Sequence, residues 1–445
     1  MENVFRAYDI RGIYKKDITE EFARKIGLSY GNVLGAGKTV VVGRDARIGG
    51  PELQAAITEG LLAAGVSVID IGMVPIPVLN YRCMQDDVDA GVIISASHNP
   101  PEFNGIRFRQ GDGTGFISCI PRIKELYLTS GFKEAPLEQR GSVTAETTDS
   151  VVDAYIDHVL SKVSLSRNLR VVLDPGNGAA SGVASKLFER AGCEVTSIFD
   201  TPDGMFPGRG PHPTAKTLGA LSARVKEEGA DAGFAYDGDS DRVVSVDDTG
   251  HVLSAEESGI LMIREIFKDA PGKVALNIDC SMVVEEEVKA LGGTVERIRV
   301  GDVFLAEAVK RGAVFAMESS SHFIVPSIFP FDDGISNSLF MARLLSETNK
   351  KMSELTMHIP EYPIIRKTVE VPDERKFGVV AAVGKRFEGY RVNEIDGAKV
   401  DFDEGWALVR ASNTQPLLRL TSEAKTHALA EEYMRKIEAA LNQVV

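Results

Sequence analysis

The sequence predicts a multidomain α/β protein. Its 445 residues exceed what one hydrophobic core usually serves, and a composition of 44% hydrophobic and 26% charged residues is that of a globular protein. One pattern occurs three times: a β-branched strand, a loop, an amphipathic helix and a glycine turn into another strand. The first strands of these repeats lie at residues 40–42, 171–173 and 274–276. Such repeats predict βαβ units with right-handed crossovers, and therefore mixed or parallel sheets.

Apolar periodicity places the remaining elements. The three repeats predict helices over residues 53–64, 184–191 and 283–291. After Pro360 the pattern changes to short strands joined by Asp-Gly and Glu-Gly turns, followed by a long helix, which predicts a smaller α+β domain. The strands of this domain are expected at residues 390–392, 399–402 and 406–410, and the helix at residues 422–441. We expect four domains, over residues 1–147, 148–250, 251–360 and 361–445.

Composition excludes several classes of protein. A formal net charge of −14 argues against nucleic acid as a partner, because that affinity rests on neutralising phosphates. The longest apolar runs, at residues 91–96 and 260–263, are much shorter than the roughly 20 residues that span a bilayer. Four cysteines without a C-x-x-C pair predict neither a disulfide framework nor a zinc site. With no signal-peptide pattern at the N-terminus, we expect a cytoplasmic protein that binds no membrane.

The clearest chemical motif follows an apolar strand and reads Asp237-Gly238-Asp239-Ser240-Asp241-Arg242. Three carboxylates at alternating positions can turn hard anionic oxygens toward one cation, which suits Mg²⁺ or Ca²⁺. A calcium-binding EF-hand loop is disfavoured, because its sixth position needs Gly and carries Arg242 here. A solvated Asp-rich turn is the structural alternative.

A second motif is a buried strand over residues 91–96 that leads Ser97, His98 and Asn99 into a loop ending at Pro100. Such a loop presents a hydroxyl where a substrate can reach it. A polar Asn-Pro turn without chemistry is the alternative. A Ser-His-Asp hydrolase is disfavoured, because His98 adjoins Ser97 in the chain and no G-x-S-x-G elbow is present.

Two further loops combine hydroxyls with charge. Residues 410–416 contain a guanidinium, hydroxyls and an amide, which together suit a dianionic phosphate. Residues 318–322 read Glu-Ser-Ser-Ser-His and offer donors and acceptors for sugar hydroxyls. Hydroxyl-rich loops are more often solvated turns, so neither loop alone indicates a binding site.

With these four loops, the sequence resembles the α-D-phosphohexomutase family, especially its phosphomannomutase/phosphoglucomutase branch, over essentially the whole chain. The ordered motifs that carry the resemblance are FRAYDIRG from Phe5, VGRD from Val42, SASHNP from Ser95, DGMFP from Asp203, DGDSDR from Asp237, VGD from Val300 and RASNT from Arg410.

The resemblance implies a four-domain, heart-shaped enzyme, with three related α/β mixed-sheet domains and a C-terminal α+β phosphate-binding domain around one cleft. It implies a mutase that interconverts a hexose 1-phosphate and a hexose 6-phosphate. Phospho-Ser97 would donate its phosphoryl group to form a hexose 1,6-bisphosphate, which turns around and returns its other phosphate to Ser97. The implied cofactor is Mg²⁺, and the bisphosphate serves as intermediate and activator.

The same resemblance implies roles for individual residues. Asp237, Asp239 and Asp241 would bind Mg²⁺ together with the phosphate of Ser97. The residues implied in catalysis are Ser97, His98, Arg11, Arg242 and His322. The residues implied in substrate binding are Tyr8, Arg107, Gly301, Glu318, Ser320, Arg410, Ser412, Asn413 and Thr414.

The sequence departs from the family's usual pattern at three places. Arg107 stands where the family usually has Lys, and because a guanidinium does not serve as a base, His98 or His322 is the alternative base. Ser321 stands where the family usually has Gly, so a positive φ should be harder to reach there. Asn413 and Gln415 match the mannose/glucose branch.

We therefore expect the glucose and mannose phosphates to be converted and glucosamine phosphate to be a poorer substrate. No acceptor for a protonated C2 amine is evident in the sequence, and burying that amine unpaired would be costly. The alternatives are a phosphoglucosamine mutase, a metal-dependent phosphatase, and a non-catalytic protein that binds sugar phosphates or Ca²⁺.

Overall fold

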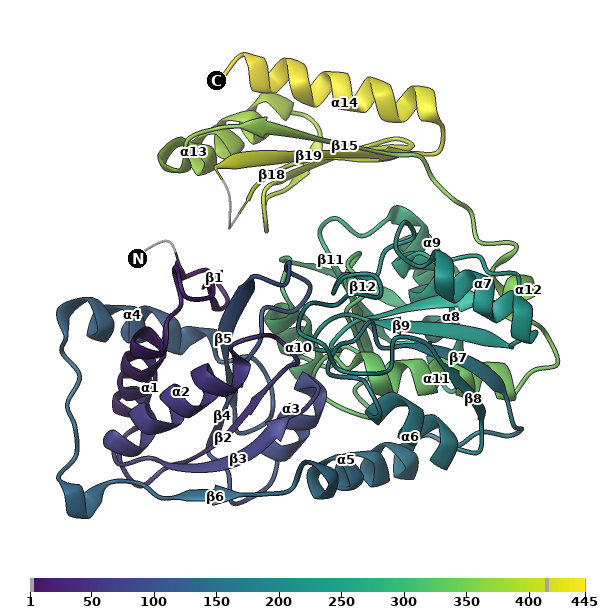
Figure 1. The fold of residues 1–445 in the computed structure, drawn as a ribbon. Coiled ribbons are helices and arrows are strands. Elements are labelled where there is room, and N and C mark those ends of the chain that lie inside the picture. Colours follow the sequence, from purple (N-terminus) through teal and green to yellow (C-terminus); the bar gives the residue numbers. More distant parts are fainter. Residues whose placement is uncertain (1–3, 413–415, 445) are drawn as a thin grey trace. The chain divides into compact units, whose positions relative to one another are not determined.

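The computed structural model describes residues 4–412 and 416–444 and divides into two compact units. The first unit comprises residues 1–254 and 320–356, and the second comprises residues 255–319 and 357–445. Figure 1 labels their elements. Each unit contains two of the four sheets that make up the predicted four-domain fold, apart from one short strand named below.

The first sheet has six strands in the order β1-β5-β4-β2-β3-β6. Strands β4, β2, β3 and β6 run parallel, while β5 is antiparallel to both β4 and β1. Helix α1 begins where the Thr19 hydroxyl accepts the Phe22 amide, and it crosses α2 closely: a Cβ on Gly60 would lie 2.1 Å from the Arg24 carbonyl oxygen. The elements are β1 (Ile10–Ile13), α1 (Glu20–Leu34), β2 (Thr39–Arg44), α2 (Gly50–Ala63), β3 (Ser67–Met73), α3 (Ile76–Cys83), β4 (Ala90–Ile94), β5 (Phe103–Gln110), η2 (Ile117–Cys119), α4 (Ile120–Thr129), η3 (Leu137–Gln139) and β6 (Val143–Ala145).

The second sheet, in the order β10-β9-β7-β8, is parallel except for β10. Strands β7 and β9 are buried at almost every position, as expected for parallel strands covered on both faces. The elements are α5 (Thr148–Lys162), β7 (Arg170–Asp174), α6 (Val183–Arg190), β8 (Glu194–Ser197), α7 (Gly219–Glu228), β9 (Ala232–Tyr236) and β10 (Val243–Asp247). The first unit also contains β14 (Phe323–Ile324), α11 (Gly334–Ser346) and α12 (Met352–Thr356).

The second unit begins with a parallel arrangement in which β11 pairs with both β12 and β13. The elements are α8 (Ala255–Ile266), β11 (Lys273–Asn277), α9 (Met282–Ala290), β12 (Thr294–Ile298), α10 (Asp302–Lys310) and β13 (Phe315–Met317). This strand–helix–strand unit, like β2-α2-β3 and β7-α6-β8, confirms the three predicted repeats.

The last sheet is antiparallel, in the order β15-β19-β18-β17-β16, with α13 and α14 packed against one face (Figure 1). The three strands predicted here are present. The predicted helix start at residue 422 is wrong: Ser422 belongs to β19, and α14 begins after Thr426, whose hydroxyl accepts the Leu429 amide. The elements are β15 (Ile364–Glu370), α13 (Asp373–Gly384), η4 (Lys385–Phe387), β16 (Arg391–Asn393), β17 (Ala398–Phe402), β18 (Gly405–Ala411), β19 (Leu417–Ala424) and α14 (His427–Asn442).

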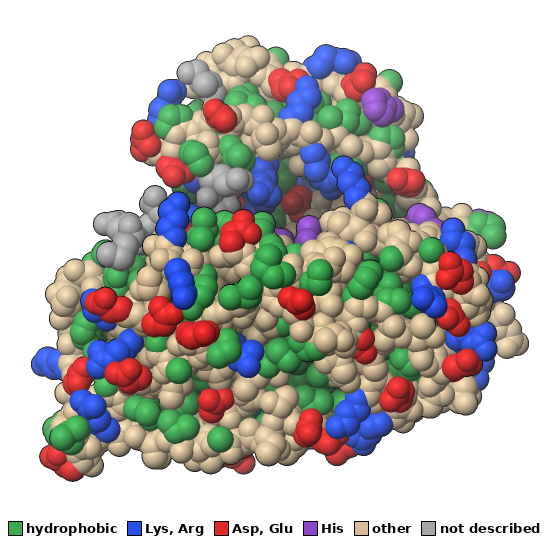
Figure 2. All heavy atoms as spheres, viewed as in Figure 1, with side chains coloured by type: hydrophobic (Ala, Val, Ile, Leu, Met, Phe, Trp, Pro, Cys, Tyr) green, Lys and Arg blue, Asp and Glu red, His purple; other side chains and the backbone are tan. Residues whose placement is uncertain are grey.

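The surface and the helix lengths agree with the composition. Acidic and basic side chains are interspersed over the face shown in Figure 2. Within the described residues, no helix combines the length and the apolar character that crossing a bilayer requires.

Candidate active site

The loop after β4 presents Ser97, which is buried. Its backbone has φ +50°, a left-handed conformation that is uncommon for a residue with a side chain and is often found at functional sites. The Ser97 hydroxyl donates a 2.8 Å hydrogen bond to Asp237 Oδ2. The predicted nucleophile and the predicted metal loop therefore meet in the first unit.

A fully buried arginine, Arg47, supports this loop. Its guanidinium donates to four backbone carbonyls of the loop, those of Ser97, Asn99, Pro100 and Phe103. Asp45 accepts from Arg47 Nε at 3.2 Å and also accepts the Ser95 hydroxyl at 2.8 Å. Sequence reasoning missed Arg47, because no spacing rule distinguishes it from other arginines in loops. Its proximity to the VGRD motif is the one signal that could have found it.

The predicted metal loop, residues 237–242, packs directly onto the loop after β4 that carries Ser97, which we call the serine loop. A Cβ on Gly238 would lie 2.5 Å from the Ser97 carbonyl oxygen, so this position requires glycine. Ser95 Oγ lies 2.8 Å from Asp239 Oδ2 as well as from Asp45 Oδ2, so the two carboxylates share its one proton. The two loops are therefore joined both by backbone contact and by side-chain hydrogen bonds.

The three aspartates fit a divalent cation. Each offers a carboxylate oxygen, and these oxygens lie within 4.8 Å of one another in the buried interior. Asp239 Oδ1 and Asp241 Oδ1 are buried and have no hydrogen-bond partner among the described residues. Burial raises the pKa of Asp237 well above its ordinary value, and the charges of Asp241 and Asp239 add to this effect. A cation such as Mg²⁺, bound by these oxygens, would satisfy the two free atoms and offset the repulsion.

Cationic side chains surround the same carboxylates. Arg107, predicted to bind substrate, donates to Asp241 Oδ2 at 2.8 Å and to Asp239 Oδ2 at 3.2 Å. Arg242 Nε lies 3.6 Å from Asp237 Oδ2. Burial alone would raise the pKa of Asp241, but the charges of His322, Arg107 and Arg242 outweigh it and hold that pKa below its usual range. The site therefore carries positive charge where a phosphate would need it.

The surroundings of the two candidate bases, His322 and His98, shift their pKa values in opposite directions. Burial and Arg242 lower the pKa of His322, but Asp241 and Asp332 outweigh them and raise it to about 9, and His322 Nδ1 is hydrogen-bonded to Asp332. For His98, the charge of Arg242 and burial lower the pKa far below its ordinary value. A general base works best with a pKa near the working pH, and neither imidazole meets that condition in this structure.

The remaining predicted residues of the first unit lie close to these loops or to the chain that leads to them. Arg11, on β1, donates to Asn99 Oδ1 at 2.6 Å and pairs with Asp9. Tyr8 precedes β1 and is half-buried, as is Ser320. Ser321 has φ +67°, so the backbone adopts the left-handed conformation here although Ser stands where the family usually has Gly.

In the second unit, loops at the carboxyl ends of three parallel strands carry functional candidates. Asp279 follows β11, Gly301 follows β12 and Glu318 follows β13. This is the edge at which open α/β sheets usually bind ligands. The Gly301 amide donates to Glu318 Oε1, and the Ser319 hydroxyl donates to Asp279 Oδ1 at 3.1 Å. Asp279 was not predicted, because an isolated Asp after a strand has no motif.

The predicted phosphate loop is connected to this edge. Arg410 Nη1 donates to Asp396 Oδ2 at 3.3 Å, and the same oxygen accepts the Val300 amide at 3.1 Å. Lys376, a buried lysine, donates to the Ser412 carbonyl. The predictions for Asn413 and Thr414 fall outside the described residues. Asp396 and Lys376, both missed in the sequence, thus hold the two described ends of the phosphate motif.

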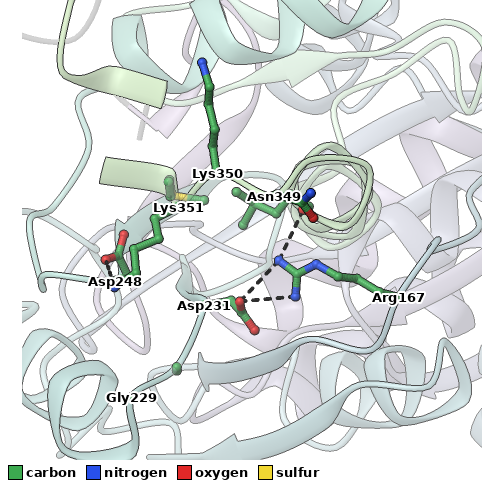
Figure 3. Close-up of a pocket in the computed structure, with 10 residues that line it drawn as sticks. Arg167, Gly229, Asp231, Asp248, Asn349, Lys350 and Lys351 are labelled. Atoms are coloured by element: carbon green, nitrogen blue, oxygen red, sulfur yellow. Dashed lines mark hydrogen bonds and ion pairs between the residues drawn. The ribbon is translucent and has the colours of Figure 1, made fainter. Parts of the chain in front are cut away.

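A separate cavity of about 220 Å³ in the first unit lies away from this chemistry (Figure 3). Its lining includes Arg167 and Asp231, which pair at 3.4 Å at the amino ends of β7 and β9. The metal loop follows the opposite, carboxyl end of β9. Lys350 points away from the paired side chains in Figure 3. This cavity therefore contributes nothing to the site built around Ser97.

Comparisons with known proteins agree with this geometry. Four profiles of one family match in order: phosphoglucomutase/phosphomannomutase, alpha/beta/alpha domain I over residues 2–133, domain II over 153–250, domain III over 254–362, and the C-terminal domain over 367–440. A probable phosphoglucosamine mutase of Methanopyrus kandleri is 40% identical over 97% of this chain and 96% of its own length. A phosphoglucomutase/phosphomannomutase of Thermococcus kodakarensis is 34% identical over 98% of this chain and 97% of its own length.

The fold comparison agrees with the sequence comparisons. The crystal structure of a phosphoglucomutase/phosphomannomutase family protein from Burkholderia thailandensis has a TM-score of 0.90 and 29% identity, and it covers 100% of this chain and 98% of its own. The chain therefore belongs to the phosphoglucomutase/phosphomannomutase family, whose members are mutases that shift a phosphate within a sugar.

Proposed function

We propose that this mutase interconverts a hexose 1-phosphate and a hexose 6-phosphate through a phosphoserine at position 97. The observation that supports this most directly is the strained, buried Ser97, whose hydroxyl lies 2.8 Å from Asp237 in a cluster of three carboxylates. A solvated turn would have no reason to bury three aspartates beside one serine. A non-catalytic calcium-binding protein would not need the hydroxyl at that place.

Asp237, Asp239 and Asp241 would hold Mg²⁺, which supplies positive charge to the phosphoryl oxygens when bound. The chain's own residues do the rest. Arg107 and Arg242 offset the charge that spreads over the phosphoryl group during transfer. Arg47 keeps the serine loop in position by holding its carbonyls.

The proposed cycle has two transfers. In the first, a sugar hydroxyl bonds to the phosphorus of phospho-Ser97 and the bond from phosphorus to Ser97 Oγ breaks. The proton that the sugar hydroxyl loses ends on Ser97 Oγ, which becomes a hydroxyl again. The resulting bisphosphate then presents its other phosphate, and the Ser97 hydroxyl takes that group in the reverse reaction. Arg410 and Ser412 would hold the phosphate that is not reacting, which orients the sugar for attack.

The names of the relatives favour glucosamine phosphate as the sugar. The protein of Methanopyrus kandleri and a second relative from Thermococcus kodakarensis, 36% identical over the chain, are both called probable phosphoglucosamine mutases. We therefore propose glucosamine phosphate as the preferred substrate, in place of the order expected from the phosphate loop. Glucose and mannose phosphates are the second candidates, which the 34% identical phosphoglucomutase/phosphomannomutase supports.

One set of assays tests this proposal. The enzyme is supplied with Mg²⁺ and the matching hexose 1,6-bisphosphate, and kcat/KM is measured for glucosamine, glucose and mannose 1-phosphates under one condition. We expect conversion of all three to 6-phosphates, with glucosamine 1-phosphate the best. Ser97→Ala should abolish conversion and the mass increase of one phosphoryl group. Release of inorganic phosphate without isomerisation would favour a phosphatase instead.

A further inference from the structure

The C-terminal sheet has a basic face within the second unit, opposite the face covered by α13 and α14. Helices α13 and α14 cover the face that carries Val409 and Leu420, whereas Arg410 and Arg419 alternate onto the other face. Arg410 is the register partner of Arg419, and Arg419 that of Thr368. Lys and Arg side chains gather on the side of this domain away from α14 in Figure 2.

This face forms one wall of a cavity of about 390 Å³. Its lining combines the sheet residues Arg366, Arg410, Arg419 and Thr421 with Asp279 from the loop after β11. Of the described residues that line it, Asp279 is the one with a negative charge. Arg419 is the register partner of Arg410 and lines the same cavity as Asp279. Burial and the charge of Arg410 lower the pKa of Arg419, and the charge of Asp279 acts in the opposite direction.

Asp279 is held in place but retains capacity for further bonds. Ser319 Oγ donates to its Oδ1 at 3.1 Å, so the carboxylate is oriented by a neighbour on the sugar loop. A carboxylate has about four acceptor positions, and one hydroxyl uses only one of them. The cavity therefore places a fixed anion beside the arginines proposed to hold a phosphate.

A ligand that complements this cavity carries a dianion and a cation on neighbouring atoms. A 2-amino sugar 1-phosphate has this arrangement, because its phosphate and its ammonium group are attached to adjacent carbons. In glucose 1-phosphate, a hydroxyl replaces the ammonium group and can donate a hydrogen bond without charge. Both contacts use the negative charge of the Asp279 carboxylate, but only the ammonium group adds an opposite charge and makes the contact an ion pair, so Asp279 should discriminate between the two sugars.

We infer that Asp279 is a specificity-determining residue that accepts the C2 ammonium group of a hexosamine 1-phosphate whose phosphate is bound at Arg410. This inference rests on the proposed phosphohexomutase function. It assigns the acceptor that the sequence did not reveal. When the 6-phosphate occupies the Arg410 site instead, the amine is remote from that phosphate, and Asp279 contributes little.

The first test compares Asp279→Asn with the unmodified enzyme, using glucosamine 1-phosphate and glucose 1-phosphate with Mg²⁺ and the matching bisphosphates. The ratio of kcat/KM for glucosamine over glucose is expected to fall at least tenfold. Asp279→Glu, which keeps the charge, should retain a preference for glucosamine even where both rates fall. The control, Asp401→Asn, removes a half-exposed carboxylate on β17 and should leave the ratio unchanged.

The second test determines the orientation in which the sugar phosphate contacts Asp279. A substitution does not change the equilibrium constant of the isomerisation, so kcat/KM must fall by the same factor in both directions. Binding affinities of the two phosphate isomers must therefore show which isomer places its amine at Asp279. Calorimetry on the Ser97→Ala protein should show that Asp279→Asn raises the Kd of glucosamine 1-phosphate at least fivefold more than that of glucosamine 6-phosphate. Binding that persists in Arg410→Ala is assigned to the Ser97 end and subtracted.

The outcomes distinguish failure of the proposed mutase function from failure of the proposed role of Asp279. If the unmodified enzyme converts no hexose phosphate, the proposed function fails. If it converts glucosamine phosphate but Asp279→Asn leaves the sugar ratio unchanged, or weakens both sugars or both phosphate isomers equally, Asp279 has only a structural role and this inference is overturned. Should Asp279→Asn fail to fold, as judged by its melting temperature, loss of the glucosamine preference in Asp279→Glu would overturn it.

Discussion

Replacing Arg47 with Met should loosen the serine loop and lower the stability of the first unit. Its guanidinium donates to four loop carbonyls, and its Nε pairs with the fully buried Asp45 at 3.2 Å. A hydrogen bond from a charged donor is worth about 1.5–3 kcal/mol, so four would sum to about 6–12 kcal/mol. The bonds share one side chain, however, and water can enter a loosened loop.

The better guide is the cost of breaking a buried ion pair, about 3–5 kcal/mol, and we expect a loss of about 4 kcal/mol in the free energy of unfolding. Urea titration measures this loss, and intact mass measures the phosphorylation of Ser97 after incubation with a hexose bisphosphate. Both should decrease in Arg47→Met, and Arg47→Lys should lie between Met and the unmodified protein. The control is Arg140→Met, which removes an exposed ion pair with Glu134 at 2.7 Å and should cost less than about 1 kcal/mol. If Arg47→Met costs no more than the control and Ser97 is still fully phosphorylated, the reasoning is refuted.

Asp396→Asn should lower kcat/KM for hexose 1-phosphates at least tenfold, because its carboxylate joins Arg410 to the Val300 amide; an effect no larger than that of the half-exposed Asp401→Asn control would contradict this. Chelation should abolish turnover, and added Mg²⁺ should raise the melting temperature of the apoprotein but not of Asp237→Asn, because a ligand that binds only the folded state stabilises it; an equal rise in both proteins would exclude the three-aspartate site. Lys399 is buried, and burial together with Arg297 lowers its pKa to about 7, so the folded protein binds fewer protons than the unfolded chain between about pH 7 and the ordinary lysine value. Across that window, the free energy of unfolding of the unmodified protein should therefore rise with pH relative to that of Lys399→Met, on the order of 3 kcal/mol by pH 9.5. Urea titrations at several pH values measure this difference. Parallel pH profiles of the two proteins would show that the pKa shift is absent.

Much of the fold was predictable because local sequence and tertiary structure agree. The β-branched runs at residues 40–42 and 171–173 form β2 and β7, and the helices between the strands follow their apolar periodicity. The terminal helix was misplaced for a physical reason: Leu418, Leu420, Ser422 and Ala424 alternate inward on a strand, and the short polar turn before Thr426 carries little signal. Helix boundaries of this kind depend on the cap rather than on the apolar pattern.

The candidate site was predictable where a motif concentrates several polar groups, as around Ser97 and Asp237. Residues that act on those groups from elsewhere in the chain were not. Arg47 and Lys376 act through backbone carbonyls, so nothing in their local sequence reveals their partners. Asp279 and Asp396 are single carboxylates whose proposed roles depend on tertiary contacts with Ser319 and Arg410.

The close packing of Gly238 against the Ser97 carbonyl has a consequence for motion. Because Ser95 and Ser97 also bind Asp239 and Asp237, the loop that bears the nucleophile and the loop that would bear the cation cannot slide past each other without breaking several buried contacts. The two loops therefore form one rigid body. In the proposed cycle, the nucleophile and the cation would therefore keep their relative positions through both transfers.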